Sequence, residues 1–383
     1  MSEKHVVVPN PIGMSYFGIS FEAGGIWEGH DVPRTTGNQG PPYRARGTSH
    51  LMEHLMCKPY EYLYPKMREL GIEDNAGTSD NKVVFFAYGL SEHLGGIAQT
   101  MIDKIINQDK LWSEEEFENE KNIVLQEYDD YFNRQDHGAW LNFMRKYYNY
   151  YGAIGRRKEI EEFSFDDSIK SAEAYFKSPN LICEVLHGSK DRVKIPDGMT
   201  FKSNPLPGGI KFGEYNTDQE SVPKEDQSVV FMFSKNTFSL DIASKVRLIS
   251  ICLAGGLESP LYQETREKRG LVYNISIMNL VMGSVFVPMV DAQTGSEDEL
   301  IDVLSNFFSK DMSEWISEER FRICKSGIVV NSKMAAMMPH SSVTQTVLGD
   351  YNPFEGIDNF SYEEAIVLAN QIFCSDNLHL DSY

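Results

Sequence analysis

Two stretches of the chain read alike: Tyr175-Phe-Lys-Ser-Pro-Asn-Leu-Ile-Cys183 and Ile372-Phe-Cys-Ser-Asp-Asn-Leu-His-Leu380. Upstream of each stretch the same order of segments occurs: a strand-like run, a helix-like stretch, β-rich runs and two further helical segments. In the first part these span residues 16–23, 48–57, 82–90, 92–107 and 114–133, and in the second 228–234, 240–253, 272–291, 298–308 and 318–333. Helices and strands interleaved in this way predict an α+β fold made twice, as two homologous α/β sandwich domains whose mostly antiparallel sheets carry helices on one face.

A stretch rich in Pro and Gly separates the two parts. Residues 193–227 contain Pro196, Pro205 and Pro207 and show no sustained hydrophobic period, which is typical of a linker. A length of 383 residues also favours about two domains, at roughly 150 residues each. We therefore predict an N-terminal domain over residues 1–192, a linker over 193–227 and a C-terminal domain over 228–383.

The composition excludes several classes of protein. With 36 Lys and Arg against 56 Asp and Glu, the formal charge is −20, which disfavours binding to nucleic acid or to an anionic membrane. The acidic excess either attracts basic peptides or only keeps the surface solvated. Five widely spaced Cys favour reduced thiols. The sequence shows no pattern of a signal peptide or a transit peptide. Its apolar runs are all much shorter than the roughly 20 residues that span a bilayer. We therefore predict a cytoplasmic protein.

The pattern that carries chemistry is Gly47-Thr-Ser-His-Leu-Met-Glu-His-Leu-Met-Cys57. His50, Glu53 and His54 stand at i, i+3 and i+4, so on a helix that starts at residues 47–49 they share one face. Zinc binds imidazole and carboxylate ligands, and H-x-x-E-H is the inverted form of a zinc peptidase motif in which the Glu acts as general base. The alternative is that both histidines line a helix surface without a metal.

A third ligand would be an acidic residue on another helix. Residues 114–128 are rich in Glu, and Glu120 and Glu127 lie seven apart, two turns along one helix face. Such a helix is usually solvent-exposed, but the run Ile123-Val124-Leu125 indicates that this one is at least half buried. A buried carboxylate is compensated when it binds zinc or a ligand histidine.

At these residues the sequence resembles the pitrilysin, insulysin and mitochondrial processing peptidase family of inverzincins. By that resemblance His50, His54 and Glu127 would hold one Zn²⁺ per chain, Glu53 would be the general base, and Glu120 would orient the site. Asn75-Ala76-Gly77-Thr78-Ser79 is similar to the family's edge strand, which implies that Asn75 and Ala76 pair with the substrate backbone.

The second part carries a further resemblance. Residues 253–273 contain Gly255-Gly256 and the basic run before Gly270, and they are similar to the family's other signature. The resemblance implies that Arg266 and Tyr273 bind substrate and that Tyr273 helps to polarise the scissile carbonyl. Without the family, this stretch reads as a helix C-terminus that enters a strand.

Together these features predict a zinc-dependent endopeptidase that binds peptides or unfolded segments as an added β-strand in a clamshell chamber. Long single-chain members of the family have four domains. Two domains therefore imply a homodimer, or a heterodimer with a related chain, in which Arg266 and Tyr273 reach the partner's zinc site.

The alternatives are a catalytically idle structural or assembly subunit on the same fold, and a metal-dependent hydrolase with a non-peptide substrate. Departures from the family are an inserted loop at 28–46, Gly77 in place of an aromatic residue, and Cys57 in place of Phe.

Overall fold

The computed structural model describes residues 13–21, 23–29, 45–106, 111–176, 179–185, 210–215, 217–223, 226–337 and 354–383. The chain divides into two compact units. Unit 1 comprises Met1–Asp130, Tyr150–Pro207 and Ala335–Gly349, and unit 2 comprises Tyr131–Asn149, Gly208–Met334 and Asp350–Tyr383.

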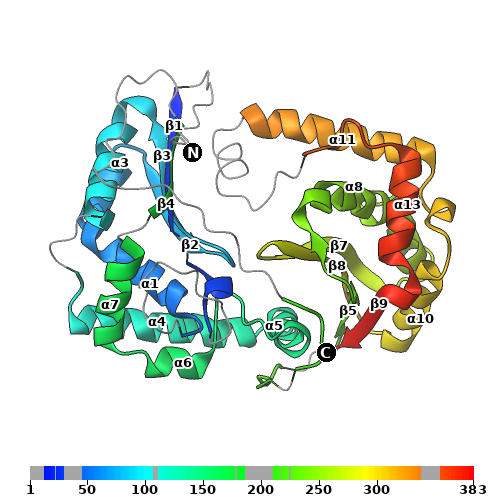
Figure 1. Cartoon of the computed structure of the whole chain (residues 1–383), viewed down its shortest axis with the longest axis horizontal. Coiled ribbons are helices and arrows are strands. Elements are labelled where there is room, and N and C mark those ends of the chain that lie inside the picture. The colour runs from blue at the N-terminus through cyan, green and yellow to red at the C-terminus, as the bar shows by residue number, and fades with distance from the viewer. Residues whose placement is uncertain are drawn as a thin grey trace. The chain divides into compact units, whose positions relative to one another are not determined.

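Unit 1 is built on a four-stranded antiparallel sheet. Its strands are β1 (Met14–Phe21), β2 (Glu73–Thr78), β3 (Val83–Leu90) and β4 (Pro179–Val185), in the order β2-β3-β1-β4. The helices are α1 (Thr48–Cys57), α2 (Tyr64–Glu69), α3 (Ser91–Ile106), α4 (Glu114–Phe132), α6 (Arg157–Glu162) and α7 (Phe165–Phe176), with a 3₁₀ turn η2 (Lys58–Leu63) between α1 and α2. Figure 1 shows α1, α3 and α7 on one side of this sheet.

Alternation along β3 explains how the sheet meets its helices. Val83, Phe85 and Ala87 are buried, whereas the residues between them are half-buried. The period of two places these three side chains on one face. On α3 an apolar stripe is buried, made of Leu94, Ile97, Ala98, Met101, Ile102 and Ile105, and α3 packs against β1 and β3. The core of unit 1 therefore lies between its sheet and its helical layer.

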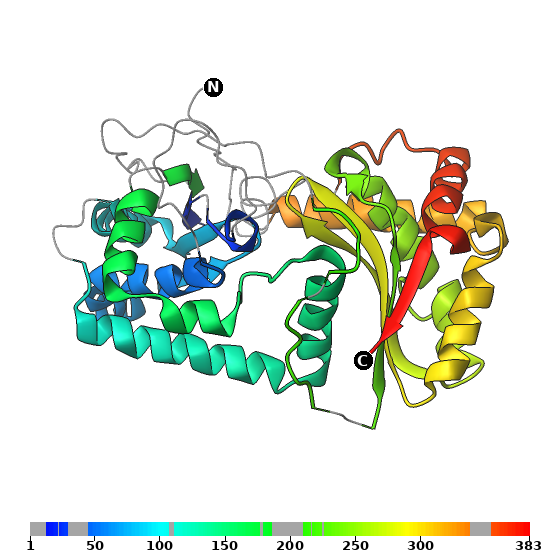
Figure 2. The ribbon, with the colours of Figure 1, turned by 60° about the horizontal axis from the view of Figure 1, so that its bottom comes forward.

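Unit 2 repeats this strand plan. Its strands are β5 (Ser228–Ser234), β6 (Phe238–Ser239), β7 (Val272–Met282), β8 (Val285–Thr294) and β9 (Leu378–Ser382). All pairings are antiparallel: β8 lies between β5 and β7, and β9 pairs with β5, as Figure 2 shows. The main helices are α5 (Gln135–Tyr148), α8 (Ala243–Ala254), α10 (Glu297–Phe308), α11 (Glu318–Met337) and α13 (Tyr362–Phe373). Strands β5, β7, β8 and β9 thus correspond in order and pairing to β1, β2, β3 and β4.

In unit 2 the helix α5 also lies against the sheet. The Phe143 ring is 4.5 Å from that of Phe233 and 5.0 Å from that of Phe231, measured between ring centroids. Val230 and Met232, which alternate with these two Phe residues along β5, belong instead to the core that α8, α10 and α13 share. Both faces of β5 are therefore covered, which explains why this strand is an almost continuous buried run rather than an alternating one.

The predicted α+β fold with two antiparallel sheets and helices is confirmed, but in unit 2 helices cover both faces of the sheet rather than one, because α5 packs on the face of β5 opposite to α8. The sequence did not predict α5, α6 and α7 between residues 135 and 176. The predicted domain bounds at 192/193 and 227/228 stay a prediction, and most of the 28–46 loop and of the linker lies outside the described residues. Within the described ranges, no helix combines the length and the apolar character that crossing a bilayer requires.

Candidate metal centre and active site

The start of α1 is fixed by two buried glutamates. The Glu28 carboxylate accepts hydrogen bonds from the backbone N–H groups of Gly47 and Ser49, both at 2.6 Å. Glu159 accepts from the Arg46 backbone N–H at 2.7 Å and from its guanidinium at 2.9 Å. A carboxylate at a helix N-terminus satisfies backbone donors and complements the helix dipole. These contacts set the position of the helix that carries the histidines.

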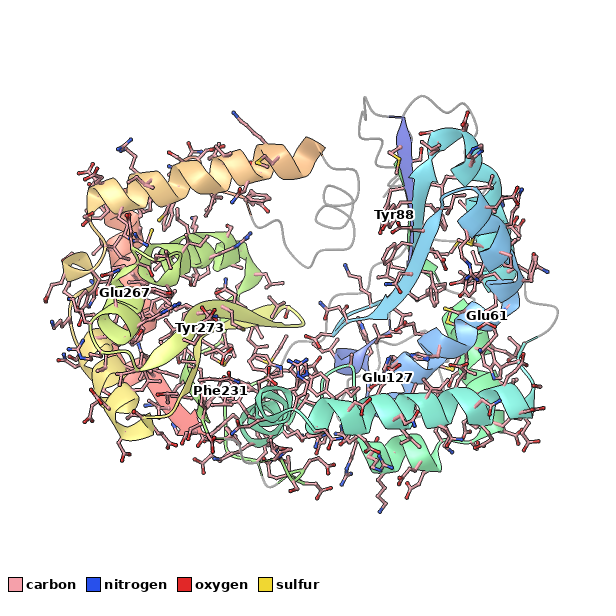
Figure 3. The ribbon with its side chains drawn as sticks, turned by 180° about the vertical axis from the view of Figure 1, so that it is seen from behind. Glu61, Tyr88, Glu127, Phe231, Glu267 and Tyr273 are labelled. Atoms are coloured by element: carbon pink, nitrogen blue, oxygen red, sulfur yellow. The ribbon has the colours of Figure 1, made fainter. Side chains whose placement is uncertain are left out.

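The histidines of α1 converge with one glutamate of α4. His50 Nε2 lies 3.3 Å from Glu127 Oε2, and His54 Nε2 lies 3.7 Å from the same oxygen. One ligand atom of each residue can be chosen so that all three lie within 4.8 Å of one another. Figure 3 labels Glu127 on α4, where that helix runs beside α1. The described residues contain no second group of this kind.

A second carboxylate of α4, that of Glu120, contacts His54 at the ring nitrogen that does not face Glu127. Glu120 is buried, and its Oε2 lies 3.1 Å from His54 Nδ1. Its other oxygen pairs with Lys58 Nζ at 2.5 Å. With Nδ1 engaged by a carboxylate, His54 directs Nε2 toward Glu127. This is the arrangement in which a ligand histidine has its tautomer and ring orientation set by an acidic partner.

The donor set fits zinc. Two imidazole nitrogens and one carboxylate oxygen are one of the three-ligand sets found in catalytic zinc sites, which leave a fourth position open. Burial acts to lower the pKa of His50, but its hydrogen bond to Glu127 and the negative charge of Glu53 outweigh that effect, so its pKa is raised. The same hydrogen bond lowers the pKa of Glu127. Both shifts favour a protonated His50 beside an ionised Glu127, so a bound cation would compete with that proton.

Glu53, the expected base, is held by a hydroxyl of the sheet. Thr78 Oγ1 donates a hydrogen bond of 2.6 Å to Glu53 Oε2. Thr78 is the last residue of β2, and α1 packs against this strand. Thr78 therefore fixes one carboxylate oxygen of Glu53 on the α1 face that also carries the histidines.

Cys57 is not part of the metal-ligand group. Its sulfur accepts a hydrogen bond of 3.3 Å from the Tyr60 hydroxyl. Burial, the largest effect, raises the pKa of the Cys57 thiol to about 12. A thiolate is the form of Cys that binds metal, so this thiol is a poor ligand near neutral pH.

Asn75 and Ala76 lie on β2 at the edge of the sheet, and α1 packs against this strand. Among the strands that the structure describes, β2 pairs only with β3. Both residues line a cavity of about 630 Å³ to which Glu53 and His54 also contribute. The structure thus places the expected peptide-binding strand and the expected base on one cavity.

Arg266 and Tyr273 lie in unit 2 and contact each other. Arg266 occupies a π-helical turn, Gln263–Glu267, and its Nη1 donates to the Tyr273 carbonyl at 2.8 Å. Its guanidinium also lies over the Tyr273 ring, 4.8 Å from the centroid. The Tyr273 side chain is 80% exposed. π-helical turns are rare in proteins, and they often occur at functional sites. The turn that carries Arg266, and the exposed Tyr273 ring that Arg266 contacts, therefore form a candidate functional pair.

Three residues that position the site were missed by sequence reasoning. Glu28 lies at the start of the segment interpreted as an insertion, and Glu159 lies where no element was predicted. Thr78 was quoted only as part of the edge strand. The sequence carries little information about Glu28 and Glu159, because acidic residues are usually exposed and both of these are buried. Neither residue stands at a regular spacing from the helix whose start it stabilises.

Comparisons with known proteins agree with this geometry. Residues 36–151 match the sequence family described as Insulinase (Peptidase family M16), and residues 180–328 match the Peptidase M16 inactive domain. A protein named "Uncharacterized zinc protease" from Rickettsia felis is 25% identical over 86% of this chain and 85% of its own. The uncharacterized zinc protease YmxG of Bacillus subtilis is 22% identical, over 92% of this chain and 90% of its own. The crystal structure of a protease from Helicobacter pylori superposes with a TM-score of 0.75 at 15% identity, covering 100% of this chain and 98% of that one.

Proposed function

Because the chain belongs to the peptidase M16 (insulinase) family, we propose that it is a zinc-dependent endopeptidase that cleaves peptides or unfolded protein segments. The single observation that carries the proposal is the convergence of His50, His54 and Glu127, with Glu53 on the same helix. The names of the two bacterial relatives support the choice of metal and reaction.

The geometry supports a role for each of these residues. His50, His54 and Glu127 would hold the zinc ion, which when bound supplies Lewis-acid polarisation of a peptide carbonyl and acidifies a water molecule. Glu53 would take a proton from the attacking water and pass it to the leaving amine. Thr78 holds Glu53 in place, and Glu120 keeps the His54 ring in the orientation that presents Nε2.

Recognition of the peptide would use the edge of the sheet. A substrate that adds to β2 as a further strand would form main-chain hydrogen bonds near Asn75 and Ala76. Such bonds are independent of the side chains of the peptide. Specificity must then come from pockets beside the strand.

The decisive experiment combines metal content with cleavage. The wild-type protein should bind one zinc per chain and cleave a peptide library. Glu53→Gln should retain the zinc and lose activity by about 10²–10⁴-fold, because only the base is removed. Glu92→Gln, an exposed residue of α3, is the matched control and should behave like wild type. Zinc binding without cleavage by the wild type would instead favour an idle structural subunit, and no zinc would defeat the proposal.

We also propose that the protein acts as a dimer, in which Arg266 and Tyr273 of one copy complete the zinc site of another. Glu53→Gln and Tyr273→Phe should each be inactive alone. Mixing the two variants should restore activity, since one mixed site combines an intact Glu53 with an intact Tyr273. No recovery on mixing would show that both residues must come from one chain. A monomer with full activity at nanomolar concentration would contradict the dimer.

A further inference from the structure

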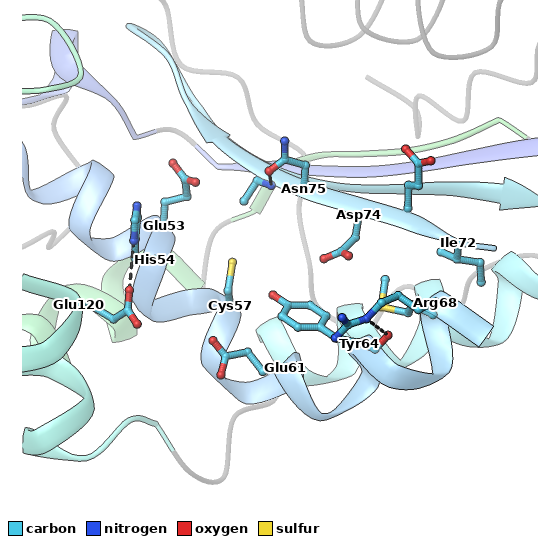
Figure 4. Close-up of a pocket in the computed structure, with 13 residues that line it drawn as sticks. Glu53, His54, Cys57, Glu61, Tyr64, Arg68, Ile72, Asp74, Asn75 and Glu120 are labelled. Atoms are coloured by element: carbon cyan, nitrogen blue, oxygen red, sulfur yellow. Dashed lines mark hydrogen bonds and ion pairs between the residues drawn. The ribbon is translucent and has the colours of Figure 1, made fainter. Parts of the chain in front are cut away.

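The cavity beside the expected base has a distinctive lining, and we call it the acidic pocket. It lies in unit 1 between β2 on one side and the continuous run of α1, η2 and α2 on the other (Figure 4). Its volume of about 630 Å³ falls within the roughly 300–1,000 Å³ that is usual for ligand sites. Glu53 and His54 form part of its wall, so the pocket is continuous with the expected catalytic groups.

One part of the pocket is apolar. Met67 and Ile72 are buried and line it together with the half-buried ring of Tyr64. Cys57 stands on the α1 side, where its small side chain leaves the space open. These groups can cover the hydrocarbon stem of a long side chain.

The rest of the lining is strongly acidic. Five carboxylates, Glu53, Glu61, Glu73, Asp74 and Glu120, face a single cationic lining residue, Arg68. Arg68 is exposed, and its Nε donates only a long hydrogen bond of 3.4 Å to the Tyr64 carbonyl.

Four of the five carboxylates are already engaged. Lys58 pairs with Glu61 at 2.8 Å and with Glu120. Glu73 accepts from the Tyr88 hydroxyl, and Glu53 accepts from Thr78.

Asp74 differs from these four. It is half-buried, and its carboxylate forms no ion pair with any residue in the described part of the chain. Burial raises the pKa of Asp74, against the opposing effect of its own backbone N–H. A partly desolvated carboxylate without a cationic partner is unfavourable, and a cation brought by a ligand would relieve that cost.

We propose that the acidic pocket binds a lysine or arginine side chain of the peptide substrate, at a position next to the scissile bond, and that Asp74 selects its charge. The inference rests on the proposed endopeptidase function and names its substrate class. A lysine or arginine matches both parts of the pocket, with its stem on Met67 and Ile72 and its cationic head at Asp74. A purely apolar side chain would leave Asp74 unpaired, and an acidic one would be repelled.

The first test measures cleavage preference. Cleavage sites in a digest of denatured proteins by the zinc-loaded enzyme should show Lys or Arg enriched at one of the two residues that flank the cut. Two peptides that differ only in Lys or norleucine at that residue should then differ about tenfold in kcat/KM, which corresponds to about 1.4 kcal/mol. In Asp74→Asn that ratio should fall toward one, because the Lys peptide loses its advantage over the norleucine peptide. Asp103→Asn, the same change at an exposed residue of α3, should leave the ratio unaltered.

The second test uses binding alone. In a Glu53→Gln background, the zinc-loaded protein should bind the Lys peptide about tenfold more tightly than the norleucine peptide by fluorescence anisotropy, and Asp74→Asn should remove the difference. Zinc-dependent cleavage without enrichment of Lys or Arg would overturn the inference and leave the endopeptidase function standing. An unchanged ratio in Asp74→Asn would also overturn it. Failure to cleave any peptide would overturn the function, and this inference with it.

Discussion

The two units share a strand plan but not their chemistry. In unit 1, β1 lies between β3 and β4, and β2 pairs with β3. In unit 2, β5 lies between β8 and β9, and β7 pairs with β8. The helix that follows the first strand is α1 in unit 1 and α8 in unit 2. α1 carries His50, Glu53 and His54, whereas α8, Ala-Ser-Lys-Val-Arg-Leu-Ile-Ser-Ile-Cys-Leu-Ala, contains no His, Asp or Glu. The candidate metal site is therefore a set of side chains that occurs on one copy of the fold among the described residues.

The later helices differ in the same way. α4 presents Glu120 and Glu127 toward α1, whereas α11 has its acidic residues, Glu318 and Glu319, in the first turn only. Unit 2 instead exposes Tyr273 and supports it with Arg266. The comparison is consistent with the proposed roles, in which the candidate metal ligands lie on unit 1 and the pair proposed to bind substrate lies on unit 2.

The largest effect should come from removing a ligand on α1. We expect His50→Ala to reduce bound zinc to background and peptide cleavage by about 10³-fold or more, because the described residues of unit 2 contain no equivalent group of ligands. Metal analysis and a fluorogenic peptide measure both. His93→Ala, a histidine of α3 outside the site, is the control and should keep one zinc per chain. Full zinc content in His50→Ala would contradict the assignment of the metal site to α1 of unit 1, since the metal would then be bound elsewhere.

A smaller effect should follow from loosening His54. In Glu120→Gln the carboxylate that engages His54 Nδ1 becomes an amide, and the ion pair with Lys58 is lost. We expect zinc affinity to fall by about 10–100-fold, the usual cost of removing such a partner. Competition with a chelator measures the affinity. Glu118→Gln, on the exposed side of the same helix, should leave the affinity unchanged, and an equal loss there would point to the charge of α4 rather than to the contact.

The difference between the units also shows what sequence can predict. The spacing of His50, Glu53 and His54 predicted their shared face because i, i+3 and i+4 geometry is local to a helix. The strand order followed from the repeat of segments. The contribution of Thr78 did not follow, because it depends on where the end of β2 falls against α1. Asp74 was likewise unremarkable in the sequence, and only the folding of α2 under β2 makes it part of a pocket wall.

A moderate effect should come from Thr78. Thr78→Val keeps the shape and strand preference of the side chain but removes the hydrogen bond to Glu53. Because a hydrogen bond to a charged group is worth about 1.5–3 kcal/mol, we expect kcat to fall by at least roughly tenfold. KM and zinc content should stay unchanged, which separates a positioning role from damage to the fold. Thr100→Val on α3 is the control. A rise in KM with kcat preserved would contradict the role of Thr78 in holding the base.

The smallest effect concerns unit 2 and should alter stability rather than catalysis. Asp291 lies within β8, opposite Phe231 of β5 and Ser276 of β7, and burial, the main cause, raises its pKa from 3.8 to about 6. The folded protein therefore keeps this proton to higher pH than the unfolded chain does, so its contribution to stability is complete below about pH 4 and is lost as the pH rises through 6. Asp291→Asn should remove this loss.

The stabilisation by Asp291→Asn should thus be small at about pH 4, grow as the pH rises to about 6, and level off at about 1–2 kcal/mol at pH 7–8. Denaturant unfolding of both proteins across that range measures it, with the exposed Asp302→Asn of α10 as the matched control. Zinc content and kcat should not change, because Asp291 lies in unit 2 and the candidate ligand group lies in unit 1. A pH-independent difference would show that Asp291 ionises normally in the folded state. A loss of zinc would instead show that the sheet of unit 2 affects metal binding in unit 1, which we do not expect from the separation of the two units.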